Sequence, residues 1–201
     1  MENGYLTIQA QEESPGSYTS ARLRTRYKQD FLYGRMEAKI KVPHGGGMWP
    51  AFWMMPTDDV YGVWAASGEI DIMETSNGTN IVGGALHFGG QWPDNTYISG
   101  AYDGDGNTDF SQDFHVYALE WEADQMRWYV DGVEYFSASS YQWYSLADLN
   151  NPRAPFDQRF HLLLNVAVGG NYTGCTNSGC ITAEFPQQMV VDYVRVYQWQ
   201  E

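Results

Sequence analysis

The sequence predicts an all-β protein, folded as a sandwich of two antiparallel sheets. Short segments in which apolar and polar residues alternate follow one another along the chain, and turn residues separate them. Glycine is frequent, with 21 residues, as suits a chain with many turns. Only the segment 141–150 suggests a short helix, which Asn151-Pro152 would end. At 201 residues, the chain is predicted to form one domain with a substantial core.

The individual strands are placed by their apolar patterns and by the turns between them. Segments 49–55 and 68–75 are more continuously apolar than the others, as is typical of central strands buried on both faces. Asp131-Gly132 stands between two alternating segments and predicts a tight hairpin turn. In order, strands are expected at 5–11, 21–27, 31–42, 49–55, 68–75, 81–88, 96–102, 114–121, 126–130, 133–136, 161–168 and 189–198.

Composition and charge limit the classes of partner. The net charge of −14 argues against nucleic acid and against an anionic membrane surface. No run approaches the ~20 apolar residues of a membrane span. A signal peptide is not expected, because the chain passes from Met1 directly into a strand pattern. Aromatic residues make up 16% of the chain, which suits a sugar-binding face, an interface or a β-rich core. The acidity alone also fits the solubility of a secreted protein.

The most informative segment is Gly68–Thr75, which places three carboxylates in a short apolar strand. Alternation puts Glu69 and Asp71 on one face and two isoleucines on the other. Plain alternation would also place Glu74 beside those isoleucines, where an unpaired charge is costly. One extra residue, a β-bulge at about Met73, would return Glu74 to the face of the other two acids.

Three carboxylates on one sheet face repel each other, so a folded chain keeps them chiefly when chemistry or a metal needs them. Two carboxyl groups about 5–5.5 Å apart match the geometry of a retaining glycosidase. We assign Glu69 as nucleophile, Glu74 as general acid and then general base, and Asp71 as the partner that orients them. A solvated acidic strand and a metal cluster are the two alternatives.

The two cysteines, Cys175 and Cys180, flank four residues in a loop rich in glycine and asparagine. Their spacing allows a small loop closed by a disulfide, and two free thiols are the alternative. A zinc site is disfavoured because neither histidine nor further cysteine accompanies the pair. A disulfide would favour an extracellular location.

Six segments, spread along nearly the whole chain, carry a family resemblance: Tyr33–Ile40, Gly45–Met54, Ser67–Thr75, Ala85–Phe88, Asn165–Asn171 and Val191–Tyr197. They resemble glycoside hydrolase family 16, and within it the bacterial laminarinases, which are endo-1,3-β-glucanases. The resemblance implies a β-jelly roll whose concave sheet forms the substrate cleft, with one catalytic domain over residues 1–201. It also implies the catalytic triplet Glu69, Asp71 and Glu74. The extra Met73 is similar to the bulge that laminarinases share with agarases and carrageenases.

The resemblance further implies tryptophans in the cleft. Trp64, which precedes Glu69 by five positions, resembles a laminarinase tryptophan that packs against the sugar beside the scissile bond. Trp49 is expected in the cleft wall. Both could instead pack within the core, and Trp53, on a more apolar stretch, is expected to do so.

Three further residues are expected to touch substrate. His87 resembles a histidine on the leaving-group side of the cleft, and Trp92 lies in the loop that follows. An ordinary strand histidine and a loop anchor are the respective alternatives. Arg35 is expected to donate to sugar hydroxyls or, alternatively, to form a structural ion pair.

The resemblance is incomplete at the start of the chain, because the family's leading segment has no counterpart before Gly4. In the family, a structural calcium is held on the convex side by an early glutamate, by a carbonyl corresponding to Gly4 and by an aspartate corresponding to Asp192. The early glutamate is missing, so Gly4 and Asp192 are the only predicted ligands. No cofactor is expected for catalysis.

The sequence as a whole predicts a retaining endo-β-1,3-glucanase that hydrolyses laminarin-like glucans as a secreted monomer. The alternative from another class is a non-hydrolytic jelly roll that binds β-glucan. An enzyme of the same family acting on mixed-linkage glucan or agarose is the second alternative.

Overall fold

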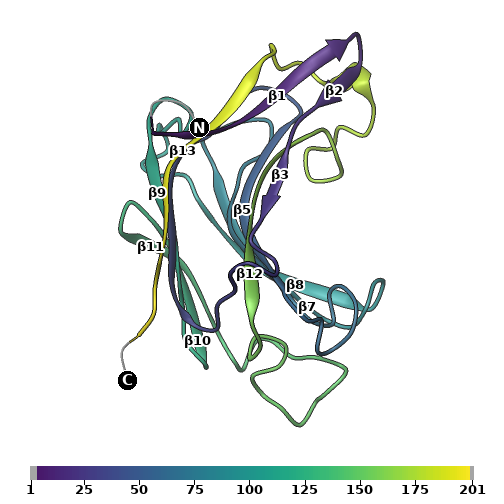
Figure 1. Cartoon of the computed structure of the whole chain (residues 1–201), viewed down its shortest axis with the longest axis vertical. Coiled ribbons are helices and arrows are strands. Elements are labelled where there is room, and N and C mark those ends of the chain that lie inside the picture. The colour runs from purple at the N-terminus through teal and green to yellow at the C-terminus, as the bar shows by residue number, and fades with distance from the viewer. Residues whose placement is uncertain (1–3, 200–201) are drawn as a thin grey trace.

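The computed structural model describes residues 4–199, which form two antiparallel sheets packed face to face (Figure 1). The seven-stranded sheet has the order β11-β10-β9-β4-β13-β1-β2, and the six-stranded sheet has the order β3-β12-β5-β6-β7-β8. The strands of the seven-stranded sheet are β1 (Leu6–Ser14), β2 (Ser17–Thr19), β4 (Gly34–Lys41), β9 (His115–Trp121), β10 (Gln125–Val130), β11 (Val133–Ser139) and β13 (Gln187–Tyr197). Those of the six-stranded sheet are β3 (Arg22–Arg24), β5 (Met48–Pro56), β6 (Glu69–Glu74), β7 (Val82–Gly89), β8 (Asn95–Tyr102) and β12 (Phe160–Val168).

The predicted all-β fold is confirmed, and the hairpin is where the sequence places it. Asp131 and Gly132 have positive φ angles of 50° and 82° and connect β10 to β11. The helix expected at 141–150 is wrong, because this segment consists of turns. Tertiary contacts hold it: the buried Ser145 hydroxyl donates to the Ala66 carbonyl at 2.9 Å. Among residues 4–199, no helix is long and apolar enough to cross a bilayer.

The core lies between the two sheets, where their inward-facing side chains interdigitate. Large rings from the seven-stranded sheet dominate it. Trp121, fully buried, meets Phe160 edge to face with ring centroids 5.4 Å apart. Trp128, also fully buried, packs beside Phe136 at 4.7 Å.

Two paired glycines let these rings reach the backbone of the six-stranded sheet. Gly84 in β7 lies opposite Gly100 in β8. A Cβ at Gly84 would overlap the Trp128 ring, and one at Gly100 would overlap the Phe136 ring. At these two positions no side chain separates the strand backbone from the aromatic rings, so a larger residue at either would force those rings to shift.

Candidate active site

A β-bulge in β6 brings the acidic residues to one face of the six-stranded sheet. The pairing register of β6 shifts between Asp71 and Glu74, as the sequence pattern predicts. Ile72 and Met73 are both buried in the core as a result. Glu74 is thereby returned to the face of Glu69, and both line the same cleft.

Each of the two outer carboxyl groups accepts a hydrogen bond from a tryptophan. Trp64 Nε1 donates to Glu69 Oε2 at 2.6 Å, and Trp49 Nε1 donates to Glu74 Oε1 at 2.7 Å. Charge-assisted bonds of this kind fix a carboxylate more firmly than neutral ones do. The two carboxyl groups are therefore held in defined orientations before any sugar binds.

The strand between these two carboxyl groups is also tethered from behind. Trp128, on β10 of the opposite sheet, donates its Nε1–H to the Asp71 carbonyl at 2.8 Å. A buried carbonyl without a partner would be costly, so this bond stabilises the backbone at the bulge. The residue that holds the bulge thus belongs to the sheet that does not form the cleft.

Burial raises the pKa of every carboxyl group in this cluster. The pKa of Glu69 rises to about 8, first through burial and then through the charge of Asp71. The pKa of Asp71, which is 2% exposed, lies well above its ordinary value because of burial and the charge of Glu74. Burial also raises the pKa of Glu74, although the Trp49 N–H and the charge of His87 oppose this. Burial therefore favours the protonated forms in this cluster, and a raised pKa is what a general acid requires.

The cleft around these acids has a volume of about 730 Å³ and is lined mainly by apolar atoms and aromatic rings. On the side of β7 and β8, the Trp64 ring lies 5.8 Å from His87, which lies 5.5 Å from Tyr97. On the opposite side, Trp49 lies 5.3 Å from Tyr172. Such rings suit the apolar faces of sugars, and the volume is that of a small-molecule or oligosaccharide site.

His87 lies close to the acidic cluster, as the sequence predicts. Its Nε2 is 3.3 Å from Asp71 Oδ2, an oxygen that is buried and has no hydrogen-bond partner among the described residues. One ligand atom from each of Glu69, Asp71 and His87 lies within 4.8 Å of the others, a spacing that could also accommodate a cation.

Two predicted substrate contacts are not brought into the cleft. Arg35 lies on β4 of the opposite sheet, where it pairs with Glu37 and Glu120 at 3.0 Å each. The expected contact between Arg35 and sugar is therefore corrected to the structural ion pair. Trp92 is 73% exposed and is not among the residues that line the cleft. Its backbone N–H donates to the Trp64 carbonyl at 3.2 Å.

Trp53 was expected in the core, and this prediction is wrong. It is only partly buried, and its Nε1 donates to Asn165 Oδ1 at 2.8 Å. The Arg22 guanidinium lies over its ring at 5.1 Å. Strand alternation could have predicted this position. Trp53 is four positions after Trp49, and residues an even number of positions apart point to the same face of a strand.

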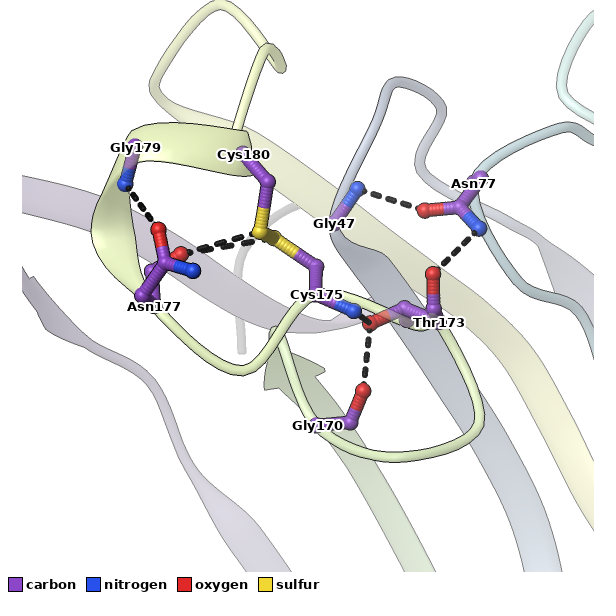
Figure 2. Close-up of a disulfide and its surroundings, with 8 residues drawn as sticks. All are labelled: Gly47, Asn77, Gly170, Thr173, Cys175, Asn177, Gly179 and Cys180. Carbon is purple, nitrogen blue, oxygen red and sulfur yellow. Dashed lines mark hydrogen bonds between the residues drawn. A yellow bond between two sulfur atoms is a disulfide. The ribbon is translucent and has the colours of Figure 1, made fainter.

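Tyr97 and Tyr172 line the cleft but were missed by the sequence interpretation. Tyr97 alternates along β8 like an ordinary exposed strand residue, so nothing marks it. Tyr172 lies in the loop that contains the two cysteines, and the structure joins Cys175 to Cys180 in a disulfide (Figure 2). A tyrosine in a polar loop gives no periodic signal.

Asp192, one of the residues predicted to hold calcium, is engaged in an ion pair. Asp192 Oδ2 accepts a hydrogen bond from Lys39 Nζ at 2.8 Å, so an ammonium group already neutralises this carboxylate. The single group of three acidic or histidine ligands found among residues 4–199 lies in the cleft and does not include Asp192. A Lys39–Asp192 ion pair is the better description of this position.

Comparison with known proteins identifies the family of the chain. The profile of glycosyl hydrolases family 16 matches residues 1–162, and the chain belongs to this family. It is 44% identical to glucan endo-1,3-beta-glucosidase A1 of Niallia circulans, over the whole chain but only 30% of that protein. It is 42% identical to a beta-1,3-glucan-binding protein of Penaeus monodon, over 76% of this chain and 47% of that protein. The chain thus spans less than half of these curated relatives.

Solved structures share this fold over the whole length of the chain. The catalytic domain of an endo-1,3-beta-glucanase (laminarinase) from Thermotoga petrophila superposes with a TM-score of 0.83 and 39% identity. The match covers 100% of this chain and 80% of that domain. The two-sheet architecture predicted from the sequence is therefore that of a laminarinase catalytic domain.

Proposed function

We propose that the protein is a retaining endo-β-1,3-glucanase that hydrolyses laminarin-like glucans. The observation that carries this proposal is the bulge in β6, which brings Glu69 and Glu74 into one cleft with a tryptophan N–H on each. The family membership and the similarity to endo-1,3-beta-glucanases support the same reaction.

In the proposed reaction, protonated Glu74 donates its proton to the glycosidic oxygen as the bond to the anomeric carbon breaks. The Glu69 carboxylate attacks that carbon and forms a glycosyl ester. Glu74, now ionised, takes a proton from water, and the resulting nucleophile releases Glu69. Two inversions at one carbon retain the β configuration. The two carboxyl groups carry every proton and bond change, so the reaction needs no cofactor.

The surrounding residues prepare the two carboxyl groups for these different roles. Burial raises the pKa of Glu69, and the Trp64 N–H opposes that rise by favouring the ionised form, which a nucleophile requires. Burial and the charge of Glu74 raise the pKa of Asp71 well above its ordinary value, which favours its protonated form between the two outer carboxyl groups. One of its carboxylate oxygens lies within 4.8 Å of an oxygen of Glu69. His87, beside Asp71, opposes the rise in the pKa of Glu69 and Glu74 when it is charged.

A neutral glucan is the proposed partner because the cleft combines aromatic rings with acids. The acids and the net charge of −14 would repel polyanions such as nucleic acid and anionic lipid. The disulfide between Cys175 and Cys180 fits a secreted protein. We propose further that the 201 residues act as one monomeric catalytic domain.

The test is reducing-end release from laminarin by the wild-type protein, with Glu69→Gln as the inactive control. Lichenan and agarose serve as competing substrates. Proton NMR of the fresh products should show the β anomer first. Preferential cleavage of agarose or lichenan would contradict the substrate, and an α anomer formed first would contradict the retaining mechanism.

The similarity to a beta-1,3-glucan-binding protein keeps binding without hydrolysis as a second candidate. Simple binding does not require three close carboxyl groups, each with a raised pKa. Retention of laminarin on wild-type protein without any release of reducing ends would favour this candidate.

A further inference from the structure

We propose that Asn77 is a positioning residue that braces the disulfide-closed loop 170–180 against Trp49, and through Trp49 sets the orientation of Glu74. This inference rests on the proposed function, because it assigns Glu74 the role of acid and base. Asn77 would touch neither the substrate nor the reacting atoms.

Asn77 connects three segments that are distant in the sequence (Figure 2). Its Oδ1 accepts the Gly47 N–H at 2.8 Å, just before β5, and its Nδ2 donates to the Thr173 carbonyl at 3.0 Å. Its backbone N–H also donates to the Met48 carbonyl at 3.0 Å. Because Asn77 follows Glu74 by three positions, it ties the end of the catalytic strand to the start of β5 and to the cysteine loop.

The loop that receives this brace is internally closed (Figure 2). The Thr173 hydroxyl donates to the Gly170 carbonyl at 2.8 Å and accepts the Cys175 N–H at 3.1 Å. The Cys175–Cys180 disulfide then fixes the far side of the loop. A closed loop has fewer conformations than an open one, so the brace at Thr173 positions the loop as a unit.

Two residues of the loop pack against the Trp49 ring. The Tyr172 ring lies 5.3 Å from the Trp49 ring. Gly170 approaches so closely that a Cβ there would be 3.0 Å from Trp49 Cζ3, and its φ of +117° suits glycine alone. The indole is therefore confined, and its Nε1–H points to Glu74 at 2.7 Å.

The confinement of Trp49 matters because its N–H favours the ionised form of Glu74 and lowers the pKa of that carboxyl group. If the loop moves away, the indole gains freedom and this hydrogen bond weakens. Glu74 is then less well aimed at the glycosidic oxygen, and its pKa rises further. Loss of the brace should thus lower turnover and move the pH profile together.

The substitution that isolates the brace is Asn77→Gly. Asn77 has a φ of 61°, which glycine adopts without strain, so only the two side-chain bonds are lost. Asn77 is exposed to solvent, so the core stays intact. We expect kcat on laminarin to fall about fivefold, the order of one lost hydrogen bond. The basic limb of the pH profile should shift to higher pH. Asn107→Gly, in an exposed turn, should change neither kcat nor the pH profile.

Two further variants show whether the effect runs through the loop and Trp49. Cys175→Ala/Cys180→Ala should lower kcat and shift the basic limb in the same direction as Asn77→Gly. In a Trp49→Phe background, Asn77→Gly should cause no further pH shift, because the donor is already gone. A full shift in that background, or an unchanged kcat and pH profile in Asn77→Gly itself, would overturn the proposal.

Titration of Glu74 by NMR, in protein labelled at the glutamate side-chain carboxyl carbon, separates this proposal from the proposed function. If the wild-type protein is inactive on every glucan, the proposed function fails, but Asn77→Gly should still raise the pKa of Glu74. If the wild-type protein is active and the pKa of Glu74 is the same in both proteins, only the positioning role fails.

Discussion

The two sheets of the sandwich treat their acidic side chains in opposite ways. On the seven-stranded sheet, Glu120 accepts bonds from Arg35 at 3.0 Å and from the Tyr129 hydroxyl at 3.0 Å, and Arg127 lies 3.5 Å away. On the six-stranded sheet, the three carboxyl groups of β6 have no lysine or arginine partner within residues 4–199. Asp71 among them is only 2% exposed, and burial raises the pKa of all three.

This difference in pairing indicates a structural role for the acids of the seven-stranded sheet and a chemical role for those of the cleft. Paired acids near the surface contribute little to stability and nothing to reactivity, because a neighbouring base satisfies them. Unpaired buried acids lower the stability of the fold, and their pKa values are shifted into the range useful for proton transfer. Substitutions that remove the cleft acids should therefore impair activity, while those that remove the paired acids should not.

The largest expected effect sharpens this contrast between the sheets. Glu69→Gln should lower kcat on laminarin at least ~10³-fold, and Glu74→Gln should lower it ~10²–10⁴-fold, while both variants still bind glucan. Glu120→Gln should leave kcat within about twofold and cost at most ~1 kcal/mol of stability. Steady-state kinetics and a laminarin-binding assay on the three variants provide the measurement. Full activity in either cleft variant would show that the role assigned to that residue is wrong.

The next effect is on the pH dependence of stability. The pKa of Glu69 is raised from 4.5 to about 8 in the folded state, so its contribution favours folding below pH 4.5 and is lost as the pH rises toward 8. A glutamine at position 69 cannot ionise, so Glu69→Gln does not lose this stability as the pH rises. Relative to the wild-type protein, it should gain roughly 2–4 kcal/mol between pH 4.5 and pH 9. Urea unfolding at the two pH values measures the difference, and an equal gain at both would contradict the raised pKa.

A smaller effect tests the tether between the sheets. Trp128→Phe removes the donor to the Asp71 carbonyl, whereas Trp121→Phe removes an indole N–H that has no partner in the described structure. Both residues are fully buried. Trp128→Phe should therefore cost ~1–3 kcal/mol more than Trp121→Phe and should also lower kcat. Equal losses in denaturant midpoint and unchanged kcat would mean that the tether does not hold the bulge.

The smallest effect concerns the convex side. Because Lys39 already neutralises Asp192, addition of EDTA should change the melting temperature of the wild-type protein by less than about 2 °C. Differential scanning fluorimetry with and without added calcium is sufficient. A large stabilisation by calcium would show that the ion displaces the lysine.

Much of this architecture follows from local sequence pattern. The alternating segments predict the sandwich, and the position of Glu74 requires the bulge, because a charge beside two isoleucines would otherwise be buried. The tight turn at Asp131-Gly132 is equally local. The short strand Ser17–Thr19 has three residues and was not predicted, because so short a segment shows no period.

Features set by tertiary contacts were less accessible. Arg35 and Trp53 were assigned to the wrong environments because the sequence does not show which sheet, or which face, a strand residue will occupy. The hydrogen bonds of Asn77 join segments separated by 30 and 96 positions, so no local pattern announces them. Tyr172 depends in the same way on a loop whose shape is fixed by distant partners.

The paired glycines in β7 and β8 have a consequence for the evolution of this cleft. Aromatic rings of the core pack directly behind Gly84 and Gly100, so the cleft cannot be deepened at these positions. A descendant that needed to accept a bulkier substrate would have to open the rim, where loops tolerate insertion. New specificities should therefore arise around the edges of the groove, with its base left unchanged.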